Sequence, residues 1–363
     1  MKKILVRTAA ALLAAVSLYV TPVGAISAQK AIMLDATTGR TLYEKRADER
    51  SLIASTTKIM TALVVCQQCN VLDRVKIPKE AVGIEGSSMY LQEGEVLTVQ
   101  ELLYGLMLSS GNDAAVALAI YCGGTVEGFA QLMNDKARYL GLENTHFVNP
   151  HGLDHPEHYS TARDLATLAA YAMEDPIFSK TVSTRSVQIG QRCLSNHNRL
   201  LWRVEGADGV KTGFTKSAGR ILVSSAQRNG RRLVVVTIDD GDDWRDHAAM
   251  YEEGFSRYRP VQIVKKGDCL GDIPVVNGEQ DYVRVLAAED FSYALAQGEE
   301  PYIRLSCKGF VYGPISANSD AGYAYICLGG NVVGKIGVVF AENIGEKEVK
   351  KPSFWERRFG GAA

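Results

Sequence analysis

The chain has 363 residues and a formal net charge of −1. Its length allows two domains with substantial cores, and its balanced charge gives no support for nucleic acid binding. Seven cysteines are too few and too scattered for a small disulfide-stabilised scaffold, so we expect most of them to be core residues. Two disulfides are candidates, namely Cys66 or Cys69 with Cys122, and Cys307 with Cys327.

Residues 1–28 predict a secretory signal peptide. Basic residues come first, an apolar segment follows over residues 8–20, and small residues come after it. The apolar segment is too short to cross a membrane as a helix. We expect cleavage after Ala25 or Ala28, and a mature protein that is exported and works outside the cytoplasm, at the cell wall or the outer face of the cytoplasmic membrane.

The stretch Ser55-Thr56-Thr57-Lys58 opens an apolar run that is predicted to be a buried helix. A helix places Ser55 and Lys58 on one face, with hydroxyl and amine within reach of each other. A lysine can take the proton of a serine only if burial or nearby positive charge lowers its pKa. Alone, S-x-x-K is weak, because an N-cap serine with a solvated lysine fits it equally well and residues 27–30 also match.

The elements around this stretch are a mixture of strands and helices. Apolar runs at 31–35 and 41–44 predict a hairpin, and residues 87–96 a mobile or hairpin segment. Thr98 and Glu101 form a capping box that marks a helix start. That helix breaks at Ser109-Ser110-Gly111, and another begins directly after the break.

The second half of the chain is richer in strands. After a helix over 125–140, β-rich runs at 221–223 and 233–238 join across Asn229-Gly230, a strong hairpin signal. From about residue 260, short alternating apolar segments separated by glycines predict a small all-β module.

We therefore expect an α/β (α+β) fold, in which helices flank an antiparallel sheet and a cleft lies between the sheet and a helical lobe. Residues 29–258 form this first domain and 259–345 the all-β domain. Residues 346–363 form a basic amphipathic tail, in which aromatic side chains are mixed with basic ones. Such a tail suits an anionic membrane surface, and a disordered solvated tail is the alternative.

Two further motifs strengthen the interpretation of Ser55 and Lys58. Ser110-Gly111-Asn112 lies at the predicted helix break, and Lys211-Thr212-Gly213 directly precedes the β-rich run at 221–223. S-x-x-K, S-D-N and K-T-G together are the signature of class A β-lactamases and penicillin-binding proteins. The middle motif departs from that signature at its central position but keeps its serine and asparagine.

Over roughly Ala28 to Ile344, the chain resembles the serine-type D-alanyl-D-alanine carboxypeptidases, the low-molecular-mass penicillin-binding proteins that trim cell-wall peptides. The stretches that carry the resemblance are 54–62, 106–119, 149–153, 159–165 and 208–219. The resemblance implies the penicillin-binding-protein fold with its C-terminal β-domain. It also implies peptidoglycan stem peptides as substrate and β-lactam antibiotics as covalent inhibitors, without a metal or another cofactor.

Carried over to this chain, the resemblance implies a role for each motif residue. Ser55 attacks the carbonyl between two D-alanines and forms an acyl-enzyme, with Lys58 as its base. Ser110 relays a proton to the leaving amine, and Asn112 holds the substrate amide and orients Lys58. Lys211 supplies positive charge that favours a neutral Lys58 and attracts the terminal carboxylate.

The remaining implied contacts lie around the third motif. Thr212 hydrogen-bonds the substrate carboxylate, and Gly213 lets the substrate backbone approach closely. The backbone N–H groups of Ser55 and Phe214 form the oxyanion hole. Many relatives carry a histidine in place of Phe214, but its role there is a backbone one. Arg245 and the loop 196–199 lie where the family places secondary substrate contacts.

Four alternatives remain at this stage. A β-lactamase of class A needs a deacylating glutamate, whereas the helix from Thr161 offers only Asp164. A D,D-endopeptidase that cuts cross-links has the same three motifs. A non-catalytic wall-binding protein is disfavoured because all the chemical side chains are present. A zinc site at His151, His155 and His158 lacks a fourth ligand in the sequence. The sequence does not separate a vegetative from a sporulation role.

Overall fold

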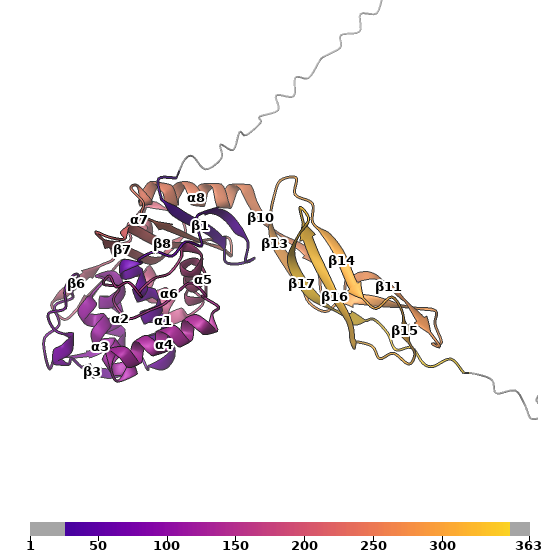
Figure 1. The fold of residues 1–363 in the computed structure, drawn as a ribbon, viewed down its shortest axis with the longest axis horizontal. Helices are drawn as coiled ribbons and strands as arrows, with labels where there is room; N and C mark the ends of the chain where they lie inside the picture. The colour runs from indigo at the N-terminus through magenta and orange to yellow at the C-terminus, as the bar shows by residue number, and fades with distance from the viewer. Residues whose placement is uncertain (1–25, 349–363) are drawn as a thin grey trace, which may run out of the picture.

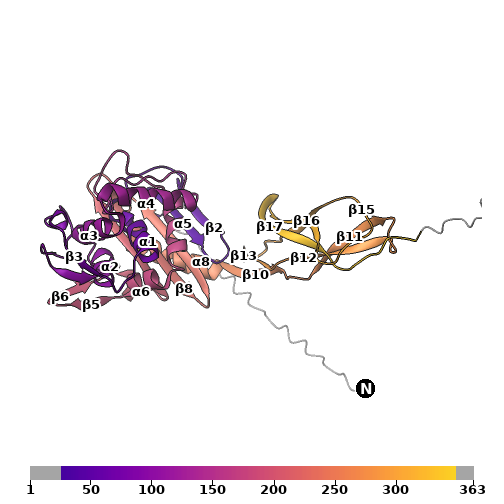
Figure 2. The same cartoon turned by 90° about the horizontal axis from the view of Figure 1, so that it is seen from below.

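The computed structural model describes residues 26–348, so the predicted signal peptide up to residue 25 and the predicted tail from residue 349 lie outside the described residues. Figure 1 shows a rounded N-terminal part, in which helices surround a sheet, and an elongated C-terminal part made of strands. Figure 2, turned by 90°, shows the two parts joined end to end through β10 (Tyr258–Val264) and β13 (Phe291–Ala296). The predicted fold class is confirmed.

The sheet of the N-terminal part is antiparallel and has the strand order β2-β1-β9-β8-β7. Its strands are β1 (Lys30–Asp35), β2 (Thr41–Lys45), β7 (Ala207–Thr215), β8 (Gly219–Arg228) and β9 (Arg231–Ile238). The predicted hairpin at the first two strands is confirmed. So is the turn at Asn229-Gly230, where φ values of 50° and 78° give the twist that a two-residue hairpin loop requires.

Helices cover both faces of this sheet, which explains why β9 has a continuous apolar run from Leu233 to Val236. Leu233 and Val235 pack in a core with α8 (Asp243–Arg257), whereas Val234 and Val236 belong to the large core on the opposite face. There α5 (Ala162–Ala172) contacts β1, β8 and β9. A strand buried on both faces has no need for polar residues at alternate positions.

The helical lobe packs against that large core. Its helices are α1 (Lys58–Gln68), α2 (Val99–Leu108), α3 (Asn112–Gly123), α4 (Val126–Tyr139) and α6 (Pro176–Ser183), with the 3-10 helices η1 (Ala54–Thr57) and η2 (Lys79–Ala81). The one-turn α7 (Leu200–Arg203) lies on the opposite face of the sheet, where Leu200 packs in the core with α8. Short strand pairs edge the lobe: β3 (Arg74–Lys76) with β4 (Val96–Thr98), and β5 (Ser186–Ile189) with β6 (Arg192–Ser195). The capping box of Thr98 and Glu101 is confirmed. Among residues 26–348 no single helix is long and apolar enough to cross a membrane, although α3 and α4, bent by 83° at their junction, pass that test as a pair.

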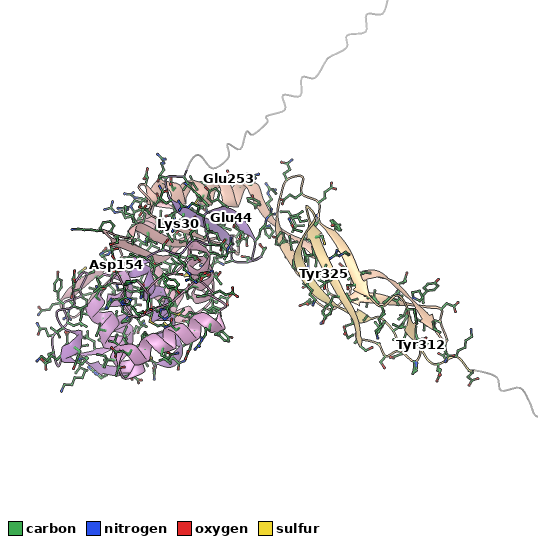
Figure 3. The ribbon with its side chains drawn as sticks, in the orientation of Figure 1. Lys30, Glu44, Asp154, Glu253, Tyr312 and Tyr325 are labelled. Carbon is green, nitrogen blue, oxygen red and sulfur yellow. The ribbon has the colours of Figure 1, made fainter. Side chains whose placement is uncertain are left out.

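The predicted all-β module is confirmed and has its own core. Its main sheet contains β11 (Cys269–Val276), β12 (Tyr282–Ala287), β14 (Tyr302–Cys307), β15 (Val311–Tyr312), β16 (Asp320–Leu328) and β17 (Asn331–Phe340), in the order β14-β16-β17-β12-β11-β15. Val283, Val285, Ile326 and Val338 are fully or almost fully buried in it. Figure 3 labels Tyr325 on β16 and, near the far end of the module, Tyr312 on β15.

A contact between the two parts fixes their junction. Arg40, in the turn between β1 and β2, forms a bidentate ion pair with Glu299, with N···O distances of 2.6 and 2.7 Å. Its guanidinium also donates to the Ala294 carbonyl at 2.5 Å and lies 4.9 Å from the ring centroid of Tyr258. The β-module is therefore held to the sheet by side chains as well as by the chain itself.

All seven cysteines are free thiols, so the predicted disulfides are absent. Cys307 lies opposite Gly322 and Cys327 lies opposite Tyr302, so the predicted pair occupies different ends of the β14–β16 ladder. Cys69 and Cys122 lie close enough for each thiol to shift the pKa of the other, but they are not covalently linked.

Replacing Asp35 by alanine is expected to lower the free energy of unfolding by about 3 kcal/mol, because it leaves a buried guanidinium without its charge partner. Arg231 Nε lies 2.6 Å from Asp35 Oδ2, and the two side chains are 6% and 0% exposed. Guanidinium chloride unfolding measures the change. The control is Glu49→Ala, which removes the exposed Arg46–Glu49 pair and should barely alter stability. Equal effects of the two variants would contradict the prediction.

Candidate active site

Ser55 lies in a tight 3-10 turn rather than at the start of an α-helix. The sequence predicts that the buried helix begins at Ser55, but α1 begins at Lys58 and η1 precedes it. Two threonine hydroxyls close the turn, since Thr56 Oγ1 donates to the Ile53 carbonyl at 2.6 Å and Thr57 Oγ1 to the Ala54 carbonyl at 2.8 Å. Such back-bonding competes with α-helical hydrogen bonding and holds Ser55 on the shorter turn.

The amine of Lys58 is buried and has three hydrogen-bond partners. Its Nζ lies 3.0 Å from Ser55 Oγ, 2.6 Å from Asn112 Oδ1 and 2.7 Å from the His151 carbonyl oxygen. The lysine as a whole is 0% exposed. The serine and the lysine are therefore in direct contact, as the S-x-x-K pattern predicts.

These partners determine how a neutral amine is oriented. A neutral amine has two hydrogens and one lone pair, and both the Asn112 oxygen and the His151 carbonyl can only accept. Asn112 is fixed in this orientation because its Nδ2 donates to the Glu85 carbonyl at 2.5 Å. Both amine hydrogens are thus taken, and the lone pair is left facing the Ser55 hydroxyl. This is the arrangement that a general base requires.

Burial keeps this amine neutral. The pKa of Lys58 lies well below its ordinary value, first because burial disfavours the ammonium ion and then because of the positive charge of Lys211, while Asp113 acts in the opposite direction. Burial also lowers the pKa of Lys211 to about 7. Lys211 lies on β7, is 1% exposed, and donates to the Thr212 carbonyl at 2.9 Å.

Ser110 and Asn112 come from the break between α2 and α3, as predicted. Ser110 is 4% exposed and has a φ of 59°, a left-handed conformation that costs a serine about 1 kcal/mol or more. Gly111 is the N-cap of α3, and Asn112 is the first residue of that helix. The break therefore brings Asn112 to Lys58 and places Ser110 beside the same pocket as Ser55.

Asp113 supports the site, a role that the sequence did not predict. Its carboxylate accepts from Ser88 Oγ at 2.6 Å and from the backbone N–H groups of Met89 and Leu91 at 3.1 and 3.0 Å. Residues 87–96 are therefore neither a hairpin nor free of contacts, because this carboxylate holds the segment over the start of α3. The only signal in the sequence was an acidic residue in the first turn of a helix, which is common.

The loop Asn149-Pro150-His151-Gly152 supplies the carbonyl that contacts Lys58. Gly152 has a φ of 90°, and a Cβ there would lie 1.8 Å from the Ala54 carbonyl oxygen, so only glycine fits against the nucleophile turn. Thr61 Oγ1 on α1 donates to the Pro150 carbonyl at 2.6 Å. Asp154, labelled in Figure 3, ties the end of this loop to β7 by accepting from Thr215 Oγ1.

Among the three clustered histidines, His158 supports this loop through hydrogen bonds. His158 Nδ1 accepts from the Val148 N–H at 3.1 Å, so the proton is on Nε2, which donates to Thr57 Oγ1 at 2.7 Å. Burial lowers the pKa of His158 to about 3, which keeps it neutral. In residues 26–348 no group of three or more His, Cys, Asp or Glu side chains could hold a metal ion.

A pocket with a volume of about 540 Å³ opens in front of these groups. Its lining residues are Ser55, Ser87, Ser110, Asn196, His197, Arg199, Thr212, Gly213, Phe214, Arg220, Ile221, Asp243 and Trp244. Gly213 lies against the nucleophile turn, because a Cβ at that position would be 3.3 Å from the Ser55 nitrogen. The backbone of β7 therefore runs beside the Ser55 N–H. The side chain of Phe214 is 66% exposed.

Comparison with known proteins gives the family. A family model described as D-alanyl-D-alanine carboxypeptidase, of the peptidase S11 type, matches residues 17–242. The chain belongs to this carboxypeptidase family. A second model, described as the C-terminal domain of penicillin-binding protein 5, matches residues 258–346.

Similar proteins cover nearly the whole of this S11 chain. The D-alanyl-D-alanine carboxypeptidase DacF of Bacillus subtilis is 32% identical over 90% of this chain and 87% of its own length. DacD of Escherichia coli is 33% identical over 87% of this chain and 86% of its own. The crystal structure of penicillin-binding protein 5 from Haemophilus influenzae has a TM-score of 0.77 at 29% identity, covering 88% of this chain and 98% of that one.

Two arginines line the pocket of this S11 peptidase, Arg199 in the predicted loop and Arg220 on β8, whereas Arg245 was the arginine predicted from the sequence. Arg220 is the cross-strand neighbour of Phe214 on β8, and its Nη2 lies 2.6 Å from Asp243 Oδ1. Arg245 lies on α8 outside the lining, 70% exposed, beside Asp242. The helix turn that carries Arg245 does reach the pocket, but through Asp243 and Trp244. The predicted loop 196–199 does line it.

Proposed function

We propose that this chain removes the terminal D-alanine from peptidoglycan pentapeptides through an acyl-enzyme on Ser55. The observation that carries the proposal is the amine of Lys58, whose two fixed acceptors leave its lone pair facing the Ser55 hydroxyl. Membership of the D-alanyl-D-alanine carboxypeptidase family supports the substrate class.

The first half of the reaction forms the acyl-enzyme. Ser55 Oγ bonds to the carbonyl carbon between the two D-alanines while its proton passes to Lys58 Nζ. The oxyanion accepts hydrogen bonds from the backbone N–H groups of Ser55 and Phe214, each typically worth about 3 kcal/mol. The C–N bond then breaks, and the leaving amine takes a proton through Ser110. Free D-alanine departs.

The second half regenerates the enzyme. Water, deprotonated by the same lysine, attacks the ester carbonyl, and the Ser55–acyl bond breaks to give the shortened peptide and the free hydroxyl. Penicillin also acylates Ser55, but its amine stays covalently attached to the acyl group. No leaving group departs as D-alanine does, and the acyl group stays on Ser55. The only carboxylate in the pocket lining is Asp243, which is paired with Arg220. Asp164 instead accepts from Thr145 and Asn144, so it is not placed as the deacylating acid of a β-lactamase.

The substrate carboxylate is held at the β7 edge. Lys211 provides positive charge, Thr212 a hydroxyl, and Arg220 a guanidinium on the next strand. Arg220 is about half exposed, so its contribution is smaller than that of a buried group.

Replacing Arg220 by alanine is therefore expected to raise KM about tenfold for a substrate with a free terminal carboxylate, with a smaller change in kcat. Arg245→Ala is the matched control and should leave KM unchanged. Initial rates with a tripeptide and with its C-terminal amide measure the effect. A KM rise in the Arg245 variant instead, or an equal rise for the amide, would contradict the assignment.

Two substrates offered in parallel test the function itself. Diacyl-L-Lys-D-Ala-D-Ala should release free D-alanine, whereas a D,D-cross-linked muropeptide dimer should remain intact. Conversion of the dimer to monomers, with no release from the tripeptide, would replace the carboxypeptidase by an endopeptidase.

We also propose export, supported by the basic, apolar and small-residue order of residues 1–28, and attachment of residues 346–363 to an anionic membrane surface. The attachment is supported by the lysines and arginines of this tail, which lie beside Phe354, Trp355 and Phe359. Co-sedimentation with phosphatidylglycerol vesicles tests it. A chain ending at Glu348 should stay in the supernatant, and equal partitioning of both chains would refute the attachment.

A further inference from the structure

Residues 26–28, which lie between the two predicted cleavage sites, are part of the folded protein. Ile26 is 6% exposed and Ala28 is 0% exposed, and both pack in the core between the sheet and α8 with Met33 and Met250. Lys45 Nζ on β2 donates to the Ala28 carbonyl at 2.6 Å and to the Ile26 carbonyl at 3.3 Å. Three residues before β1 are thus fixed by both apolar and polar contacts.

Ser27 joins this segment to the start of α8, which lies next to β1 in Figure 1. Its backbone N–H donates to Asp246 Oδ2 at 2.5 Å, and its Oγ lies 2.6 Å from Asp240 Oδ1 and 2.9 Å from Asp246 Oδ2. The Asp242 N–H in turn donates to Ser27 Oγ at 3.2 Å.

One carboxylate oxygen at this place has no partner. Asp240 is 1% exposed, and its Oδ2 is a buried acceptor without a hydrogen bond among the described residues. A buried carboxylate oxygen without a partner is destabilising, and a cation beside it removes the penalty. The nitrogen of Ile26 lies within about 4 Å of the Ser27 nitrogen, because one residue separates them. The Ile26 nitrogen therefore adjoins the residue that both carboxylates bind, since Asp240 and Asp246 each accept from Ser27.

We infer that Ile26 is the first residue of the mature chain, and that its α-ammonium group binds between the carboxylates of Asp240 and Asp246. A signal peptidase adds water across the Ala25–Ile26 peptide bond, which leaves a carboxylate on Ala25 and an ammonium group on Ile26. This inference rests on the proposed export and is independent of the proposed hydrolysis.

The other predicted site does not fit the structure. Cleavage after Ala28 removes Ile26 and Ala28 from the core and leaves Asp240 and Asp246 without Ser27. Both carboxylates would then stay buried without the donors that Ser27 supplies, which is unfavourable.

The segment that binds Ser27 also contributes two residues to the active-site pocket. Asp243 and Trp244, which line the pocket, lie on the chain between the two carboxylates that bind Ser27. The contacts of Ser27 thus support the turn that carries Asp243, the partner of Arg220.

The first experiment is secretion of the full chain from a bacterial host, followed by mass spectrometry of its N-terminus. A chain that begins Ile26-Ser27-Ala28 supports the inference. A chain that begins at Gln29 overturns it and leaves export intact, whereas a chain that keeps Met1 overturns both.

A second experiment tests the binding of the ammonium group. Purified chains that begin at Ile26, or at the same residue preceded by Gly-Ser, are compared by thermal unfolding at pH 6.5. The free Ile26 terminus should raise Tm by about 3 °C over the extended chain. Asp240→Asn keeps the acceptor for Ser27 but removes the charge, and it should abolish that difference. Equal Tm values for the two wild-type chains would overturn the binding of the ammonium group.

Discussion

Replacing Ser55 by alanine is expected to lower the release of D-alanine at least about 10⁴-fold, because within residues 26–348 no other hydroxyl forms a hydrogen bond with the amine of Lys58. The variant keeps the fold, since the side chain of Ser55 faces the pocket and η1 is closed by Thr56 and Thr57. Release from a diacyl tripeptide, followed in a coupled D-alanine assay, measures the loss.

The control for this variant is its thermal unfolding, which should match that of the wild type within about 2 °C. Ser87→Ala provides a second comparison, because Ser87 also lines the pocket but does not contact Lys58. A Ser55 variant that retains a tenth of the activity, with Ser87→Ala equally impaired, would move the nucleophile elsewhere.

Replacing Lys58 by methionine is expected to slow acylation by penicillin by about 10³-fold, the range typical for loss of a general base. Methionine fills a similar volume without a charge, so the buried position should tolerate it. Stopped-flow quenching of protein fluorescence gives the acylation rate. An unchanged rate would show that another group takes the Ser55 proton.

The pH dependence of the wild type checks the same role. The base is the neutral amine, so the acylation rate falls as pH drops through the pKa of Lys58. Burial, the largest cause, holds this pKa well below that of a free lysine. The acylation rate should therefore stay high at pH 8 to 9, where an ordinary lysine is protonated. The fall of the rate at lower pH should be missing in Lys58→Met. A wild-type acylation rate that already falls as the pH drops through about 10 would contradict a buried, neutral Lys58.

The chemistry of the site could be predicted from the sequence because it lies in short local motifs. Ser55 and Lys58 are three residues apart on one turn, and Ser110 and Asn112 flank a glycine at a helix break. Only the pairing of these motifs needed recognition of the family signature, since nothing local connects them with Lys211. The hairpins and the starts of the capped helices were also predictable from the sequence, because specific turn and capping residues mark them.

The supporting contacts could not be predicted, because they join residues distant in the chain through backbone atoms. The carbonyl of His151 contacts Lys58 across 93 positions, and Asp113 binds backbone amides 22 to 24 positions away. A backbone acceptor leaves no residue-type signature. Arg220 was not predicted for a similar reason, since the register between β7 and β8 decides that it reaches the pocket.

The most direct test of the mechanism is mass spectrometry of the protein after reaction with benzylpenicillin, because ring opening adds the whole molecule to the attacking oxygen. We predict one adduct, located by peptide mapping on Ser55, that forms in the wild type and is absent from Ser55→Ala. An adduct on Ser110 or another residue, or an adduct of equal yield in Ser55→Ala, would contradict the assignment of Ser55 as the nucleophile activated by Lys58.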